Sequence, residues 1–268
     1  MIVVAVALAS TLGACSTKGG KTGDVVSREG EVTQDWKATA EVQSEEAAAD
    51  DPALAAAVTA LEPIRTRKGT LRFVGDSVRN PEAAPVLLAR LAAGVDDPRM
   101  RAALVEALPR TGGDYGPAVA AMLTEETDAD VRVVMVAALQ RADAVSAHDG
   151  LVNALRDEDP AVRAEAARVA SMREDGSALA GELQTALGDE TPQVRAAVAR
   201  TIGVLSLTDA RDGLLPGLRD ADAEVRLQSL RAVGRIDPSF AQGLADMTAL
   251  RADTDARVAA AANRLATR

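Results

Sequence analysis

Few side chains in this chain are suited to catalysis or to metal binding. The sequence contains one histidine, His148, and one cysteine, Cys15. Two such residues cannot make a His/Cys zinc site, and one cysteine cannot close an internal disulfide. The acidic run 157–159 offers oxygen ligands, but it lacks the alternating ligands and the glycine of a calcium loop. The sequence therefore predicts no catalytic residue, no metal and no cofactor, and it places His148 in a surface turn.

Cys15 follows an apolar run, Ile2 to Ala14, that is shorter than the about 20 residues needed to cross a bilayer. The run suits the h-region of a signal peptide. It ends in Leu12-Gly13-Ala14-Cys15, which resembles the lipobox of bacterial lipoproteins. The resemblance implies removal of residues 1–14 and lipidation (palmitate) of Cys15 in the cell envelope. Ser16 resembles the residue that follows the cysteine in outer-membrane lipoproteins of Gram-negative bacteria. The alternative is a buried apolar helix with an incidental cysteine.

The composition favours a helical protein with a core of small side chains. Hydrophobic residues make up 47% of the chain but aromatic residues only 1%, so the core must be built from Ala, Val and Leu. Small side chains let helices pack closely, which points to an all-α fold. The formal net charge is −10, which disfavours nucleic-acid binding because no overall basic field attracts phosphates.

One short pattern recurs through most of the chain. Its arginine falls at 101, 132, 163, 195, 226 and 257, so that the intervals are 31, 31, 32, 31 and 31 residues. An Asp four residues earlier is suited to cap a helix, and Pro beside it suits the first helical position. An apolar helical face follows each arginine, and a second apolar helix lies between units. The spacing predicts an α-solenoid of about six helical hairpins of 31–32 residues over residues 81–268.

This pattern resembles HEAT repeats, and among them the short repeats of phycobilin-lyase subunits. In that family the recurring Asp and Arg residues form hydrogen bonds along the stack and join neighbouring repeats. The resemblance implies this role for Asp97, Arg101, Asp128, Arg132, Asp159, Arg163, Arg195, Asp222, Arg226, Asp253 and Arg257. Thr191 replaces Asp in the fourth copy, so we expect the series of ion pairs to be interrupted there.

The segment before the repeats has less regular patterning. Residues 15–50 are Gly-rich and then acidic and Ala-rich, which is typical of a flexible linker after the lipidated N-terminus, with Trp36 as an isolated aromatic residue. Residues 51–80 begin with a helical stretch and continue as a basic irregular one. We expect them to form an N-terminal helical cap over the first repeat.

Three further arginines occupy equivalent positions in consecutive repeats. Arg168, Arg200 and Arg231 each lie five residues after the repeated arginine, whereas Ala262 stands at that place in the last repeat. They can form a basic stripe for an acidic or carboxylate-bearing partner, since the guanidinium fork matches a carboxylate. Alternatively, they are solvated surface residues that balance neighbouring acids.

Two functions are compatible with these patterns. The first is a non-enzymatic, lipid-anchored scaffold in the bacterial cell envelope, in the outer membrane if the source is Gram-negative. It would bind protein partners on its concave face, with the lipid as its only membrane contact and no nucleic acid as ligand. The second is a phycobilin-lyase-like enzyme or enzyme subunit, which follows from the family resemblance alone.

Overall fold

The computed structural model describes residues 35–65, 71–73 and 76–267. The predicted signal peptide and Cys15 lie outside the described residues. The α-helices are α1 (Trp36–Asp50), α2 (Pro52–Thr59), α3 (Ala83–Ala92), α4 (Pro98–Thr111), α5 (Gly116–Glu125), α6 (Ala129–Ala138), α7 (Ala144–Ala154), α8 (Pro160–Ala170), α9 (Ala180–Ala186), α10 (Pro192–Leu205), α11 (Ala223–Ile236), α12 (Pro238–Gln242), α13 (Met247–Arg251) and α14 (Ala256–Ala266).

Short 3-10 helices and one pair of strands complete the described elements. The 3-10 helices are η1 (Asp76–Arg79), η2 (Leu139–Arg141), η3 (Gly176–Leu179), η4 (Thr208–Ala210), η5 (Asp212–Leu214) and η6 (Pro216–Arg219). The strands β1 (Ile64–Arg65) and β2 (Leu71–Arg72) pair antiparallel, with Ile64 opposite Arg72.

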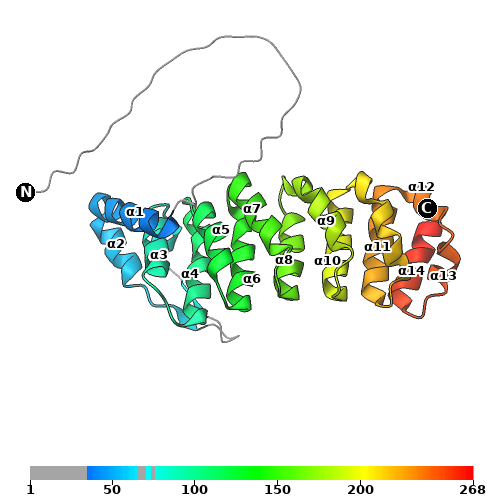
Figure 1. Ribbon diagram of the computed structural model, residues 1–268, viewed down its shortest axis with the longest axis horizontal. Coiled ribbons are helices and arrows are strands. Elements are labelled where there is room, and N and C mark those ends of the chain that lie inside the picture. The colour runs from blue at the N-terminus through cyan, green and yellow to red at the C-terminus, as the bar shows by residue number, and fades with distance from the viewer. Residues whose placement is uncertain (1–34, 66–70, 74–75, 268) are drawn as a thin grey trace, which may run out of the picture. The chain divides into compact units, whose positions relative to one another are not determined.

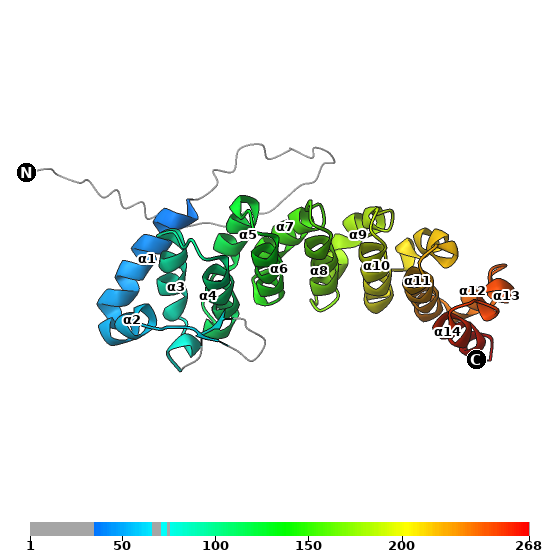
Figure 2. The same ribbon diagram turned by 90° about the horizontal axis from the view of Figure 1, so that it is seen from below.

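The predicted all-α solenoid is confirmed. Its helical hairpins follow one another in a row (Figure 1). Viewed after a quarter turn, α4, α6, α8, α10, α11 and α14 form one line of helices, which we call the second helices (Figure 2). The first helices of the hairpins form the other line. Each second helix packs against the next, as α10 does against α8 and α11.

The sequence starts each second helix in a similar way. In α8, Asp159 precedes the helix and its side chain accepts a hydrogen bond from the Ala161 N–H at 2.7 Å. Pro160 occupies the first helical position, where no N–H is needed. Buried Val162, Ala166 and neighbouring apolar residues then form the inner face. The hairpins are too short to bury such faces alone, so stacking supplies the continuous Ala, Val and Leu core.

The fifth hairpin departs from the expected pair of helices. Its first half is a series of 3-10 turns, η4 to η6, where we expected an apolar helix around Leu214 and Leu218. Gly213, Pro216 and Gly217 lie in this stretch, and both residue types disfavour a continuous α-helix. Leu214 and Leu218 are nevertheless buried, so the stretch fills the place of a first helix.

The prediction of a flexible linker through residue 50 is wrong for residues 36–50. These residues form α1, which packs against α3. Trp36 and Ala40 are buried on its inner face, so Trp36 is part of the core. Lys37 lies over the Trp36 ring and forms an ion pair with Glu125 of α5 at 2.9 Å.

The expected cap at 51–80 is helical only in part. Helix α2 is followed by the strand pair, which was not predicted. Arg90 of α3 donates from one guanidinium nitrogen to the carbonyl oxygens of Val58 and Leu61, at 3.0 and 3.1 Å. Its guanidinium also lies 5.3 Å from the centre of the buried Phe73 ring. These contacts attach α2 and the residue after β2 to the first hairpin.

Five of the repeated arginines join consecutive hairpins through the same set of contacts, which we call the arginine ladder. In each, Nε and Nη2 donate to one carboxylate of the next hairpin, and Nη1 donates to two backbone carbonyls before its own helix. Arg163 is typical, with Asp189 at 2.7 and 3.0 Å and the carbonyls of Asp157 and Glu158 at 2.8 and 3.0 Å. The other pairs are Arg101 with Glu126, Arg132 with Asp157, Arg195 with Asp220, and Arg226 with Asp253.

The acidic partner was predicted wrongly in most of these pairs. Asp97, Asp128, Asp159 and Asp222 cap their own helices and do not pair with the ladder arginines. The ladder uses the acid two residues before the cap position, and Asp253 is the one predicted acid that does pair. The expected interruption at Thr191 is also wrong, because Arg163 and Arg195 both have their carboxylates.

The last predicted ladder arginine, Arg257, has a different role. Helix α14 is capped by Asp255, and the ladder position four residues after the cap is therefore Ala259. Arg257 lies in the first turn and pairs with Asp255 and Glu224 instead. The described ladder thus ends at Arg226 and Asp253.

The hydrogen bonds of the ladder also set the charge state of its acids. Burial by itself would raise the pKa of Asp189, but hydrogen bonds from Arg163 and from the Thr191 N–H lower it below the usual value. In Asp220 the hydrogen bond from Arg195 is the main cause of a lowered pKa. Asp189 and Asp220 therefore keep their charge to a lower pH than an ordinary aspartate does.

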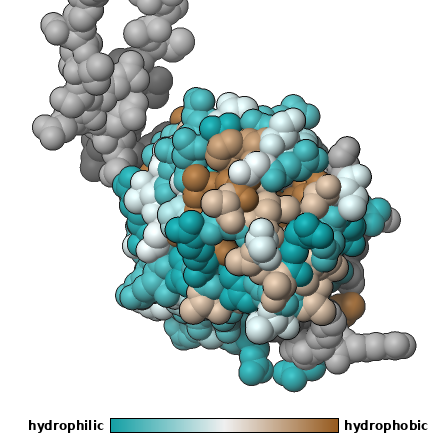
Figure 3. Space-filling model, turned by 90° about the vertical axis from the view of Figure 1, so that its right-hand side faces the viewer, coloured by the Kyte–Doolittle hydropathy of each residue, from teal (hydrophilic) through white to brown (hydrophobic). Residues whose placement is uncertain are grey.

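The C-terminal end of the solenoid is formed by the last hairpin. Figure 3 shows this end, where apolar residues gather among hydrophilic ones. Buried Leu250, Val258 and Leu265 form the core of this hairpin. Among the described residues, no helix combines the length and apolar character required to cross a bilayer.

Candidate functional site: an arginine column on the second helices

The three arginines of the predicted stripe lie on consecutive second helices. Arg168 is on α8, Arg200 on α10 and Arg231 on α11, and all three are exposed. Each stands nine residues after the residue that precedes its helix, Asp159, Thr191 or Asp222. Because the second helices lie side by side, these equivalent positions form a column across them (Figure 2).

Arg168 differs from the other two in its contacts. Its Nε and Nη2 both donate to the carboxylate of Glu165, one turn earlier in α8. This hydrogen-bonded carboxylate raises the pKa of Arg168 above its ordinary value. Nη1 of Arg168 donates to the sulfur of Met172 at 2.8 Å. The charge of Arg168 is therefore largely balanced within its own helix.

A further arginine at an equivalent position was missed from the sequence. Counting five residues from the repeated arginine Arg257 gave Ala262. Helix α14 begins after Asp255, however, and the position nine residues after this cap residue is Arg264. Arg264 is exposed on the last second helix. The signal for this shift was the second aspartate of Asp253-Thr254-Asp255, which is the actual cap. We call Arg200, Arg231 and Arg264 the arginine column.

The arginine column has no internal counter-ion in the part of the chain that the structure describes. None of its three guanidinium groups forms an ion pair or a hydrogen bond with a described residue. The nearest acid of α11 on this face, Glu224, accepts hydrogen bonds from Gln228 and Arg257 at 2.6 and 2.8 Å. The column therefore presents positive charge on a chain whose net charge is negative.

A groove of about 500 Å³ lies between α10 and α11, and Arg200 and Arg231 both line it. Its sides carry charged and polar residues, and its floor is formed by Gly203 and Ala232, where the helices approach closely. A Cβ on Gly203 would lie 2.7 Å from Cα of Ala232, so only glycine permits this approach. The remaining lining residues are Arg200, Val204, Gln228, Arg231 and Arg235. This surface can bind anions but carries no nucleophile paired with a base.

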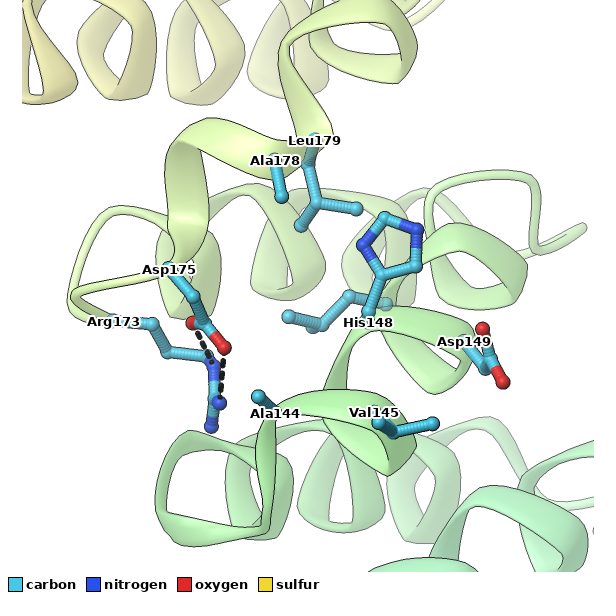
Figure 4. Close-up of a pocket in the computed structure, with 9 residues that line it drawn as sticks. Ala144, Val145, His148, Asp149, Arg173, Asp175, Ala178 and Leu179 are labelled. Atoms are coloured by element: carbon cyan, nitrogen blue, oxygen red, sulfur yellow. Dashed lines mark hydrogen bonds and ion pairs between the residues drawn. The ribbon is translucent and has the colours of Figure 1, made fainter. Parts of the chain in front are cut away.

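A second cavity, of about 280 Å³, lies between α7 and the η3 region (Figure 4). His148 lines it, and the structure places this residue inside α7, so the predicted surface turn is wrong. Asp143 caps α7 by accepting from the Ser146 N–H, which starts the helix before His148. The Asp149 side chain lies away from the imidazole in Figure 4, and Asp175 is paired with Arg173 at 2.7 Å. Around His148 we find no described nucleophile and base together.

Arg173 has a structural role at the edge of this cavity. Its Nη1 donates to the carbonyl oxygens of Leu139, Gln140 and Ala142 at 2.7–3.1 Å. These carbonyls follow α6, so Arg173 attaches α8 and η3 to the preceding hairpin. Within the described ranges, no group of three or more His, Cys, Asp or Glu side chains is arranged to hold a metal ion.

Comparison with known families agrees with this architecture. A family described as HEAT repeats matches residues 179–266, which span α9 to α14. This part of the chain is therefore similar to HEAT repeats. The arginine column and its groove therefore lie within the matched HEAT region. The arginine ladder continues the same contacts through the hairpins before residue 179. No curated protein matches the chain.

Proposed function

We propose that this protein is a lipid-anchored, non-enzymatic HEAT-repeat scaffold that binds a protein partner along its second helices in the bacterial cell envelope. The observation that carries this proposal is the arginine column, which is exposed and without a counter-ion among the described residues. HEAT arrays commonly bind other proteins through extended surfaces made of equivalent positions in successive repeats. The second helices, which we expect to line the concave side, provide such a surface.

The anchoring part of the proposal is supported by the lipobox-like residues Leu12 to Cys15. Lipidation of Cys15 would hold the solenoid at a membrane by acyl chains alone, and two or more chains are needed for stable anchoring. The long segment between Cys15 and α1 would then separate the array from the bilayer.

The anchor can be tested in the cell from which the sequence comes. Wild-type protein and the Cys15→Ser variant are expressed at full length and labelled with a clickable fatty acid. We expect the label and the membrane fraction to follow the wild-type chain and both to be lost in the variant. Equal labelling of the two chains would show that Cys15 is not the lipidated residue.

The binding surface can be tested by crosslinking in the same cells. A photoreactive residue is introduced at Val204, in the groove of the second helices, or at exposed Gln184 of α9, in the line of first helices. We expect one defined protein adduct from position 204 and none from position 184. Adducts from position 184 alone, or equal adducts from both, would contradict binding through the second helices.

The phycobilin-lyase alternative depends on the family resemblance and has no support from a particular site. A bilin-attaching protein would bind the free tetrapyrrole, and its absorbance spectrum would change on mixing with the purified chain. We expect no such change.

A further inference from the structure

The arginine column differs from the arginine ladder in what surrounds it. The ladder arginines each use three guanidinium nitrogens on a carboxylate and on backbone carbonyls, as Arg195 and Arg226 do. Arg200, Arg231 and Arg264 use none on any described residue. An arginine in each of three consecutive repeats is therefore available to bind carboxylates of another molecule.

The spacing of the column is set by helix packing. Helix α11 packs against both α10 and α14, so the three guanidinium groups come from adjacent helices. Helices in contact lie about 8–10 Å apart. When the three side chains extend in the same way from their helices, their guanidinium groups repeat at the helix spacing, and a ligand that pairs with all three presents its carboxylates about 8–10 Å apart on one side.

The polyproline II conformation of a peptide matches this spacing when every third residue carries a carboxylate. A polyproline II helix has about three residues per turn and rises about 3.1 Å per residue, so every third side chain points the same way after about 9.3 Å. In a β-strand, side chains three residues apart point to opposite faces. In an α-helix, side chains three or four residues apart are only about 5–6 Å apart, and side chains seven residues apart on one face are about 10.5 Å apart, beyond the helix spacing.

From this match we infer that the arginine column binds an acidic segment in the polyproline II conformation, with Glu or Asp at every third residue. The inference rests on the proposed function, because it names the chemistry of the partner. The groove between Arg200 and Arg231 receives the residues between two carboxylates. Its floor of Gly203 and Ala232 and the half-exposed Val204 suit apolar residues such as proline.

Two peptides of identical composition test the inference. One consists of three Pro-Pro-Glu triplets, and its isomer has the three glutamates in succession. The full-length chain, purified in neutral detergent, is titrated into each fluorescently labelled peptide at low salt. Both peptides have the same charge, so a nonspecific attraction would bind them equally. We expect the triplet peptide to bind about twofold to fivefold more tightly, which is the range for one additional exposed ion pair.

Single substitutions connect the binding to the column. We expect each of the substitutions Arg200→Ala, Arg231→Ala and Arg264→Ala to weaken binding of the triplet peptide by about threefold to fivefold. Arg156→Ala is the matched control, because Arg156 is exposed in the loop after α7 and has no ion pair with a described residue. Circular dichroism of each variant establishes that the helices are retained.

Three results would overturn the inference. The first is equal affinity for the two isomers, and the second is equal weakening by Arg156→Ala. The third is binding of the chain to anionic phosphatidylglycerol vesicles through the same arginines without binding of either peptide, which would make the column a membrane-contact surface. If position 204 still yields a protein adduct in cells while the isomers bind equally, the scaffold function stands and only the partner chemistry is wrong.

Discussion

Removal of one ladder carboxylate is expected to destabilise the solenoid far more than removal of a surface ion pair. The pair of Arg163 and Asp189 is the most informative, because both side chains are only 10% exposed. In Asp189→Ala, Arg163 retains its two backbone carbonyls but loses two charge-assisted hydrogen bonds. Such bonds contribute about 1.5–3 kcal/mol each, and breaking a buried pair costs about 3–5 kcal/mol. Since the guanidinium retains other acceptors, we expect a loss of about 3 kcal/mol in the free energy of unfolding.

The measurement is equilibrium urea unfolding followed by circular dichroism. The free energy of unfolding must fall with urea concentration at the same slope in the wild type and the variant for the comparison to hold, because repeat arrays can lose cooperativity. A second variant, Arg163→Met, keeps the apolar part of the side chain, and the double variant completes a thermodynamic cycle. We expect the two losses to be less than additive, with a coupling energy of about 2 kcal/mol.

The matched control is Asp246→Asn, which removes the partner of Arg219. That arginine is 72% exposed, so solvent screens the pair and we expect little change in stability. If Asp189→Ala lowered the free energy of unfolding by less than about 1 kcal/mol, the ladder pair would contribute no more than an exposed surface pair. The view that the ladder holds the hairpins together would then be refuted.

Two further predictions concern acid sensitivity and helix contact. The pKa of Asp220 is lowered in the folded state, so its pair with Arg195 stabilises the fold above the usual aspartate pKa of about 3.9 and is lost as the pH falls below it. Asp220→Asn should therefore destabilise the fold at pH 7. Below about pH 4 the free energy of unfolding of the variant should fall less steeply with pH than that of the wild type, as measured by urea titrations. Gly203→Ala should cost about 1–3 kcal/mol because its Cβ would meet Ala232, whereas Gly181→Ala in α9 meets no atom within 4 Å and should be neutral or stabilising by thermal denaturation.

The repeat architecture could be predicted from the sequence because its signals are local and recur. Asp before Pro and a following apolar face specify the start and the inner side of a helix, as in Asp159, Pro160 and Val162. Six recurrences then determine that helical hairpins stack. The identity of the ladder acid needed the structure, because most units contain two acids within three residues, such as Asp157 and Asp159.

Helix α1 was missed because its inner face carries little hydrophobic signal. Trp36, Ala40 and Ala47 are buried at helical spacing, but two of the three are alanines. The exposed positions between them are mostly acidic or small, so the segment as a whole reads as a polar linker. Only the contacts with α2, α3 and α5 establish that this weak face is a packed one.

The two sets of arginines show how position around one helix separates structure from binding. A ladder arginine stands four residues after the cap residue, and a column arginine stands nine, as Arg195 and Arg200 do in α10. Five residues at 3.6 per turn place the two side chains about 140° apart around the axis. The first therefore reaches the acid of the next hairpin, while the second points to solvent. Because they point in different directions, substitutions in the column should leave the ladder intact, so that loss of binding can be separated from loss of fold.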